Sequence, residues 1–318
     1  VRLFVNKYPE YKIVNADALT YAGNLENLRD VDSKPNYVFE KVNIQDAEAI
    51  EALFAKYQPT GVIHLAAESH VDNSIKDCMP FVQSNIIGTI NLLDMAVKHN
   101  IKKFIHISTD EVFGPAPIGV DYKERDRYNA TNPYSASKAA GEEMCVAFEN
   151  TYDMPIIVTH TMNVFGERQH PEKFIPMAIR KVRDGQTVTI HANKEKTKAG
   201  SRHYVHAKDV ADGLMFILNA PVEFDPIPDF GGAKIRKFNI VGPDEVDNLE
   251  LARLIAEAQG KELNYELIDF HSSRPGHDLR YALSGEYMKS LGWEPKISFR
   301  ERIKEVVDWT LENNRWLK

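Results

Sequence analysis

Short apolar runs that end in polar residues alternate with longer amphipathic segments along the first half of the chain. Such runs are typical of strands buried on both faces of a parallel sheet, and amphipathic segments are typical of the helices that cover it. The pattern predicts strands at 12–16, 37–42, 62–67, 104–107 and 155–162, and helices at 1–7, 47–56, 85–99 and 134–150. The sequence therefore predicts an α/β fold with a doubly wound parallel sheet.

The pattern becomes less regular after Gly166. Helical periodicity returns at 208–219, 247–259 and 299–311, and the lysine-rich stretch at 194–198 predicts a solvated loop. The regular alternation of strands and helices thus ends about halfway along the chain.

Composition narrows the class of protein. The chain has 318 residues, 43% of them hydrophobic, and a net charge of −7, values that suit a globular protein and argue against a nucleic-acid partner. No apolar run in the sequence is long enough to predict a membrane span. Cys78 and Cys145 lie far apart and lack the spacing of metal ligands, so we expect a reduced, cytoplasmic protein without a metal site.

The polar residues after the strand at 104–107 are the first candidates for chemistry. Ser108, Thr109, Asp110 and Glu111 follow that strand directly, and ligands of such sheets bind beyond the carboxyl ends of the strands. Two carboxyl groups held together in a dry cleft do not easily both ionise, so one can act as a base while the other donates a proton. A solvated acidic turn is the alternative for such a pair taken alone.

A second group of candidates opens the helix at 134–150. Asn132 suits the N-cap and Pro133 the first helical position, which places Tyr134 and Lys138 one turn apart on one face. An ammonium group near a phenol favours the phenolate, so Tyr134 is predicted to act as a base below its ordinary pKa. The spacing Tyr-x-x-x-Lys occurs four times, but only this copy follows a strand with a polar end and opens a capped helix.

Asp17 follows the strand at 12–16. In a dinucleotide-binding fold, an acidic residue that ends the second strand binds a ribose hydroxyl, about 20 residues after a glycine-rich phosphate loop. Counted back from Asp17, that loop and the first strand fall before Val1. Either they lie upstream, as the helical beginning without a cap favours, or the chain does not have a dinucleotide-binding fold.

Six motifs occur in the order of one known family. They are residues 17–25, 64–72, 108–114, 134–138, 171–173 and 274–278 (DALTYAGNL, HLAAESHVD, STDEVFG, YSASK, PEK and RPGHD). Together they resemble the dTDP-glucose 4,6-dehydratase family, which belongs to the extended short-chain dehydrogenases/reductases, over nearly the whole chain.

This resemblance implies an architecture and a set of ligands. It implies a Rossmann-like NAD-binding domain formed by 1–165 and 204–235, and a smaller carboxyl-terminal α/β lobe for the sugar nucleotide formed by 166–203 and 236–318. It implies a tightly held NAD that is reduced and reoxidised in one turnover, with a nucleoside-diphosphate glucose, dTDP-glucose foremost, as substrate. It also implies a homodimer formed through the helices at 85–99 and 134–150.

The resemblance also assigns catalytic roles. Tyr134 takes the proton of the sugar 4-hydroxyl while hydride leaves C4 for NAD, and Lys138 holds Tyr134 and the nicotinamide ribose. Thr109 hydrogen-bonds the 4-oxygen. Glu111 then removes the C5 proton, protonated Asp110 gives its proton to the departing 6-hydroxyl, and the hydride returns to C6.

Two further sets of positions align with the family's ligand contacts. The set for NAD is Asp17, Ala18, Leu19, Thr20, Asn43, Ile44, Leu65, Ala66, Ala67, Ser69, Ser84, Tyr134 and Lys138. The set for the sugar nucleotide is Ser69, Thr109, Asn163, Lys173, Phe174, Arg202, Asn239, Arg274 and His277. Arg202 and Arg274 make chemical sense there because guanidinium groups match diphosphate oxygens, although a surface ion pair explains each arginine equally well when taken alone.

Four departures from the family's pattern bear on the choice of nucleotide rather than on the reaction. Asn43 occupies the position where the family usually has an Asp near adenine, Val164 replaces a second Asn after Asn163, and Ser273 replaces an Asp before Arg274. The segment at 194–199 is longer than is usual in the family.

Three other functions fit parts of the pattern. One is the same dehydration of UDP-glucose, which nothing in the sequence separates from the thymidine nucleotide. A second is a nucleotide-sugar 4-epimerase, which uses Tyr134 and Lys138 but has no use for Asp110 and Glu111. The third is a non-catalytic dimeric scaffold or fragment, which would bind no NAD.

Overall fold

A computed structural model describes residues 1–219, 236–269 and 279–318 in two compact units. The first unit comprises Val1–Val112, Asn132–Thr159 and Ala220–Phe238; the second comprises Phe113–Thr131, His160–Asn219 and Asn239–Lys318. The boundaries differ from the predicted lobes, since 113–131, 160–165 and 204–219 belong to the second unit and 236–238 to the first.

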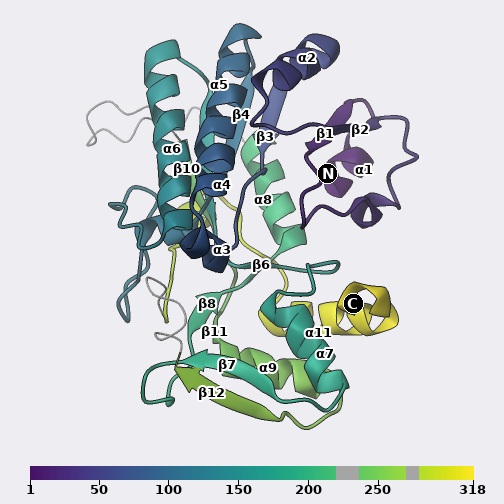
Figure 1. Ribbon diagram of the computed structural model, residues 1–318, viewed down its shortest axis with the longest axis vertical. Coiled ribbons are helices and arrows are strands. Elements are labelled where there is room, and N and C mark those ends of the chain that lie inside the picture. Colours follow the sequence, from purple (N-terminus) through teal and green to yellow (C-terminus); the bar gives the residue numbers. More distant parts are fainter. Residues whose placement is uncertain (220–235, 270–278) are drawn as a thin grey trace. The chain divides into compact units, whose positions relative to one another are not determined.

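Parallel strands form the framework of the first unit (Figure 1). β1 (Ile13–Asp17) pairs in parallel with β2 (Tyr37–Lys41), and β3 (Gly61–His64) pairs in parallel with β4 (Lys103–Thr109). With β5 (Ile156–Thr161) and β10 (Arg236–Ile240), the larger sheet has the order β10-β5-β4-β3. Successive strands with helices between them are neighbours in this sheet, which confirms the predicted doubly wound α/β fold.

Helices complete the first unit. They are α1 (Arg2–Lys7), α2 (Ala47–Tyr57), α3 (Val71–Lys76), α4 (Met79–Phe81), α5 (Gly88–Lys98) and α6 (Pro133–Tyr152), with the short turns η1 (Leu25–Leu28), η2 (Val82–Ile87) and η3 (Asp110–Phe113). Figure 1 shows α5 and α6 side by side, and α5 also packs against α2. The helix predicted at 85–99 therefore exists, but it begins as the π-helical turn η2.

One apolar core holds this unit together. Ile50 and Phe54 of α2, Leu93 of α5, Phe104 of β4 and Ile156 of β5 are all buried in it. The apolar periodicity of the predicted elements places these side chains on the inner faces, so their burial follows from the sequence pattern.

The second unit is built from shorter strands and from helices. Its strands are β6 (Val164–Phe165), β7 (Val188–Ala192), β8 (Ser201–His203), β9 (Val205–His206), β11 (Glu245–Asp247) and β12 (Tyr265–Asp269), and its helices are α7 (Phe174–Arg183), α8 (Ala207–Asn219), α9 (Asn248–Ala258), α10 (Glu286–Ser290) and α11 (Phe299–Glu312), with a last turn η4 (Asn314–Leu317). β7 pairs in parallel with β12, β6 in parallel with β9, and β8 antiparallel with β11. The predicted helices α8, α9 and α11 are confirmed to within two residues.

The prediction missed α7, β7 and β12. Pro176 obscured α7, yet it lies in the first turn of that helix, where an N–H group has no intrahelical partner to lose. β7 alternates buried and partly exposed residues, a period that Val188, Ile190 and Ala192 show in the sequence. β12 has no such alternation, and only its pairing with β7 fixes it as a strand.

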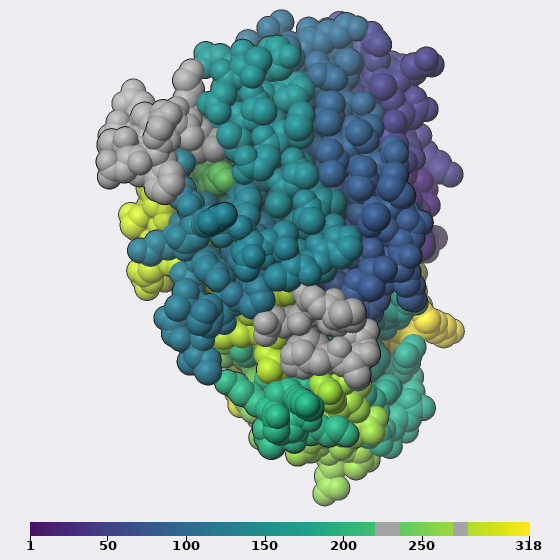
Figure 2. Space-filling model, turned by 60° about the vertical axis from the view of Figure 1, so that its left-hand side comes forward, coloured from purple at the N-terminus to yellow at the C-terminus, as the bar shows by residue number. Residues whose placement is uncertain are grey.

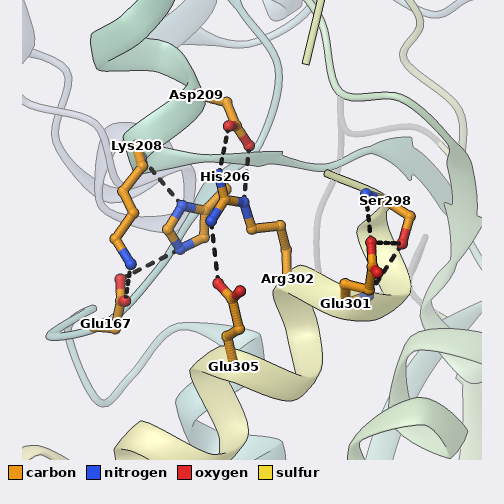
Figure 3. Close-up of polar contacts among 8 residues, drawn as sticks. All are labelled: Glu167, His206, Lys208, Asp209, Ser298, Glu301, Arg302 and Glu305. Carbon is orange, nitrogen blue, oxygen red and sulfur yellow. Dashed lines mark hydrogen bonds and ion pairs between the residues drawn. The ribbon is translucent and has the colours of Figure 1, made fainter. Parts of the chain in front are cut away.

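An ion pair anchors α11 within the second unit (Figure 3). Ser298 and Glu301 form a capping box that starts this helix. One turn into it, Arg302 donates hydrogen bonds to both carboxylate oxygens of Asp209 in α8, at 2.8 and 3.3 Å, and a third to Glu305. Only 11% of each of the Arg302 and Asp209 side chains is exposed, so this bidentate pair is shielded from water.

A histidine links the neighbouring segments. His206 accepts the Lys208 backbone N–H at Nδ1, 3.1 Å away, and faces Glu167 with Nε2 at 3.3 Å. Lys208 Nζ donates to the same carboxylate at 2.5 Å. Hydrogen bonds from His206 and Lys208 hold the pKa of Glu167 well below its usual range. These contacts tie the start of α8 to the segment that follows β6.

Two arginines of α11 provide a test of this anchor. We expect Arg302→Ala to lower the free energy of unfolding by about 3 kcal/mol, because it leaves the shielded Asp209 carboxylate without its partner. Arg300→Ala is the matched control: this side chain is 61% exposed and pairs with Glu257, so its loss should cost less than about 1 kcal/mol. Urea unfolding of both variants measures the difference, and equal losses would contradict the anchoring role.

Candidate active site

The end of β4 carries three of the predicted catalytic residues. β4 is buried along most of its length, and it delivers Thr109 and Asp110 with only 7% and 5% of their surface exposed. The chain then turns through η3, where Glu111 is half-buried. Thr109 Oγ1 donates a hydrogen bond to Asp110 Oδ1 at 3.0 Å. The strand therefore brings one hydroxyl and two carboxyl groups to a single turn.

Helix α6 begins with a capping box. Asn132 Oδ1 accepts the Ser135 N–H at 2.9 Å, and Ser135 Oγ accepts the Asn132 N–H at 3.2 Å. Pro133 occupies the first turn. The predicted cap is confirmed, and it fixes where the helix starts and hence where Tyr134 and Lys138 lie.

Lys138 is buried against β4. Only 5% of its surface is exposed, and its Nζ donates a hydrogen bond to the Ile107 carbonyl oxygen at 2.6 Å. Burial lowers the pKa of this ammonium group to about 8. The contact joins the second turn of α6 to β4 just before Thr109.

Tyr134 is not acidified by its surroundings in this structure. Burial raises the pKa of its phenol and the carboxylates of Glu111 and Asp110 raise it further, while a hydrogen bond with Thr109 acts in the opposite direction. The prediction that Lys138 lowers the pKa of Tyr134 is therefore wrong for these residues by themselves. Burial and the two acids that face the phenol raise its pKa by more than the hydrogen bond with Thr109 lowers it.

The amide of Asn132 also reaches Glu111. Its Nδ2 donates to Glu111 Oε2 at 3.0 Å, while its Oδ1 caps α6. The sequence predicted the cap but not this second contact, which joins residues 21 positions apart and leaves no local pattern. The same side chain thus links the start of α6 to one of the two acids.

The sequence analysis also missed Asn85, which lies on the π-helical turn η2 with 1% of its surface exposed. Its amide group pairs with both backbone groups of Glu68 at 2.9 Å and donates to Ser137 Oγ at 2.8 Å. A Cβ atom at Gly141 would lie 2.5 Å from the Asn85 carbonyl oxygen, so α6 approaches this turn closely. The sequence offered one signal for Asn85, an amide side chain among the apolar residues of a predicted helix. Asn85 holds the segment after β3 against α6.

Several predicted cofactor contacts lie beyond the carboxyl ends of β1 and β3. Asp17 ends β1, is exposed, and accepts the Leu19 N–H at 2.7 Å. The strand predicted at 62–67 is wrong beyond His64, where β3 ends, and Leu65 after it is 61% exposed. The remaining predicted contacts along these two segments are half-buried Ala18 and exposed Thr20, Ala66, Ala67 and Ser69. An exposed carboxylate after β1 and an exposed apolar side chain after β3 suit the ribose hydroxyls and flat rings of a dinucleotide.

A polar network follows β2. Asn43 Oδ1 accepts the Gln45 N–H at 3.0 Å, and Gln45 Nε2 donates to Ser84 Oγ at 2.8 Å. Ile44 is buried beside them with 9% of its surface exposed, and its carbonyl accepts a hydrogen bond from Asn91. The structure thus brings Asn43 and Ser84 together and places the Ile44 side chain in the core.

The predicted sugar-nucleotide contacts are divided between the units. Ser69 and Thr109 lie in the first; Asn163, Lys173, Phe174, Arg202 and Asn239 lie in the second; Arg274 and His277 lie outside the described residues. Asn163 and Lys173 are exposed, and Phe174 packs partly against the core of the second unit. Arg202 is 7% exposed, donates from Nη1 to the Ser201 and Leu279 carbonyls, and stacks on Tyr281.

Asn239 is fully buried within the second unit. Its Nδ2 donates to the carbonyl oxygens of Tyr122 and Ser284 at 3.1 and 3.2 Å, and its Oδ1 lies 3.0 Å from His160 Nδ1. These contacts fix the orientation of the amide, and its role toward the sugar nucleotide stays a prediction.

Comparison with known proteins agrees with this geometry. The profile of the family described as GDP-mannose 4,6 dehydratase matches residues 1–306. A dTDP-glucose 4,6-dehydratase from Haemophilus influenzae is 36% identical over an alignment of 334 positions, gaps included, which covers 99% of this chain and 94% of that protein. The chain belongs to the nucleotide-sugar 4,6-dehydratase family.

Solved structures support the membership in this 4,6-dehydratase family. The dTDP-glucose 4,6-dehydratase from Bacillus anthracis, crystallised in complex with NAD, is 32% identical, covers 100% of this chain and 94% of its own, and superposes with a TM-score of 0.86. A UDP-glucose 4-epimerase from Thermus thermophilus, also in complex with NAD, gives 26% identity and a TM-score of 0.79 over 93% of this chain and 98% of its own. The extended Rossmann-like fold is thus shared by both kinds of enzyme, and the choice between them depends on side chains.

The buried ammonium group of Lys138 predicts how the stability of this 4,6-dehydratase family member changes with pH. The folded protein releases the Lys138 proton near pH 8, whereas the unfolded chain keeps it until about pH 10.4. Between these values the unfolded state binds more protons, so stability should rise with pH by up to about 1.4 kcal/mol per unit relative to Lys138→Met. Urea unfolding from pH 7 to 9.5 measures this, with Lys138→Arg, which stays charged, as the control without the rise. Parallel curves for wild type and Lys138→Met would contradict the lowered pKa.

Proposed function

We propose that the protein is an NAD-dependent hydro-lyase that converts a nucleoside-diphosphate glucose, dTDP-glucose in the first place, to the 4-keto-6-deoxy sugar. The observation that carries this proposal is the single turn at which Thr109, Asp110 and Glu111 lie, facing the phenol of Tyr134 at the start of α6. An oxidation at C4 with NAD as the hydride acceptor needs no acid or base beyond the tyrosine and its lysine. A following loss of water needs an acid and a base as well, and both are present.

The oxidation step uses the start of α6. Tyr134 takes the proton of the sugar 4-hydroxyl, Thr109 hydrogen-bonds the 4-oxygen, and Lys138 holds the tyrosine and a ribose in place. NAD, when bound, supplies the hydride acceptor and later the hydride donor, and its oxidised nicotinamide adds the positive charge that a phenolate needs. Burial and two nearby acids raise the pKa of Tyr134, so a positive charge near the phenol would favour its action as a base.

The elimination step uses the two acids. Glu111 is half-buried and accepts an N–H from Asn132, an arrangement that suits a charged base for the C5 proton. Asp110 is only 5% exposed, and burial disfavours a charge on its carboxyl group, which suits the neutral acid that protonates the departing 6-hydroxyl. Different surroundings of neighbouring carboxyl groups are how one site runs acid and base chemistry at one pH.

The residues at the ends of β1, β2 and β3 fit the dinucleotide. By the family resemblance, Asp17 would bind a ribose hydroxyl, Asn43 would lie near adenine, and Leu65–Ala67 would line the path toward Lys138. This assigns dinucleotide binding to the first unit. The second unit would contribute Asn163, Lys173, Phe174 and Arg202 to the sugar nucleotide, with Arg274 and His277 as further candidates from the sequence.

We also propose a homodimer formed through α5 and α6. Figure 2 looks onto these helices, which lie beside one another on one face of the first unit. Ile87 is 38% exposed, and Ala136 and Ala147 of α6 are exposed as well, so apolar side chains are accessible on this helical face. Sedimentation velocity at micromolar concentration should give a dimer, and Ala147→Arg should dissociate it; a wild-type monomer would contradict the proposal.

A cytoplasmic location is part of the proposal. Cys78 and Cys145 are both free thiols, Cys145 in the core and Cys78 at the surface, as suits a reducing compartment. Within the described ranges, no helix combines the length and the apolar character that crossing a bilayer requires.

Isotope exchange in deuterated water tests the reaction. With the full-length protein, NAD and dTDP-glucose, we expect a 4-keto-6-deoxy product that carries deuterium at C5. Glu111→Gln should still reduce NAD but should lose C5 exchange by at least about a hundredfold. The Asp110→Asn variant should keep C5 exchange but expel the sugar 6-hydroxyl more slowly than wild type. The Tyr134→Phe variant should fail to oxidise C4.

Each competing function predicts another outcome of this assay. Product from UDP-glucose but not from dTDP-glucose would reassign the nucleotide. A 4-epimerised sugar with an intact 6-hydroxyl would identify an epimerase, and neither reduced NAD nor product would indicate a scaffold. Wild-type exchange in Glu111→Gln would remove Glu111 as the base.

A further inference from the structure

Asn132 performs two tasks with one amide group. Its Oδ1 accepts the Ser135 N–H at 2.9 Å and so caps α6, while its Nδ2 donates to Glu111 Oε2 at 3.0 Å. Only 6% of its surface is exposed, so the amide is held in place by packing as well as by these bonds. The acceptor faces the helix that carries Tyr134, and the donor faces the acid after β4.

The cap alone does not require an amide. Serine and aspartate cap helices about as well as asparagine, because each offers a side-chain oxygen to the first backbone N–H groups. Of these three residues, asparagine alone has an N–H donor that stays in place whatever the pH. The cap alone therefore does not select asparagine over serine or aspartate, whereas the contact with Glu111 uses the N–H donor that only asparagine offers.

We propose that Asn132 is a positioning residue that keeps Glu111 ionised and holds it at a fixed place relative to the start of α6. This inference rests on the proposed function, in which Glu111 removes the C5 proton. Asn132 itself does not touch the reacting atoms. It acts through Glu111, by joining the helix of the oxidation step to the base of the elimination step.

Two neighbouring groups bear on the charge of Glu111. The carboxyl group of Asp110 in the same turn disfavours a second charge beside it, and the phenol of Tyr134 from α6 faces the same part of the site. The ammonium group of Lys138, also from α6, donates to the Ile107 carbonyl. An N–H donor at 3.0 Å favours the charged form of Glu111 without adding a further titrating group.

Two conservative variants separate the cap from the donor. Asn132→Ser keeps a capping oxygen and loses the N–H donor, and Asn132→Asp keeps the cap but turns a carboxylate toward Glu111. Asn132→Ala, which loses both, reports the contribution of the cap to stability. C5 exchange in deuterated water, followed from pH 5 to 9, is the readout, together with the rate of NAD reduction and the melting temperature.

We expect Asn132→Ser to melt within a few degrees of wild type and to reduce NAD at a similar rate. The midpoint of its C5-exchange profile should be raised by about one unit, so that the loss relative to wild type approaches about tenfold at pH values below the midpoint and disappears at higher pH. Asn132→Asp should shift the midpoint further in the same direction. A purely structural role would lower both steps together and leave the midpoint where it was.

The proposal is overturned if Asn132→Ser and Asn132→Asp keep the wild-type pH profile of exchange while Glu111→Gln abolishes it. In that case Glu111 is still the base and only the role of Asn132 is refuted. If Glu111→Gln itself exchanges at the wild-type rate, the proposed role of Glu111 fails first and this inference falls with it.

Discussion

The buried contact between the Lys138 ammonium group and strand β4 is the constraint on which the candidate site depends. The ammonium group leaves water to donate to the Ile107 carbonyl oxygen, and this loss of hydration is the reason that the pKa of Lys138 is lowered. Together with the cap at Asn132, it fixes both the start and the second turn of α6 against the end of β4. The phenol of Tyr134 and the turn from Thr109 to Glu111 face each other because of these two attachments.

The surroundings of Tyr134 disfavour its phenolate. Burial raises the pKa of this phenol, and the two carboxyl groups beside it raise it further. The same carboxyl groups have no purpose in a simple oxidation or epimerisation. Their presence at the cost of a less acidic tyrosine is the physical reason to favour dehydration over the epimerase reaction that the fold also supports.

Much of this arrangement was predictable because it is local in sequence. The strand at 104–107, the cap at Asn132 and the separation of Tyr134 from Lys138 are set by short patterns, and the structure has all three. The contacts of Asn85 with Glu68 and of Asn132 with Glu111 were not predictable, since they depend on how separate elements pack. The direction of the Tyr134 pKa was also beyond the sequence, because it depends on burial and on which charges lie nearest in space.

The most direct test of the central claim follows one hydrogen atom through the reaction. The full-length protein would be given NAD and dTDP-glucose that carries deuterium at C4, and the product would be analysed by mass spectrometry and NMR. The account predicts a 4-keto-6-deoxy sugar with that deuterium at C6, since the hydride taken from C4 is returned there. Recovery of the deuterium at C4 of an intact or epimerised hexose, or no conversion at all, would contradict it.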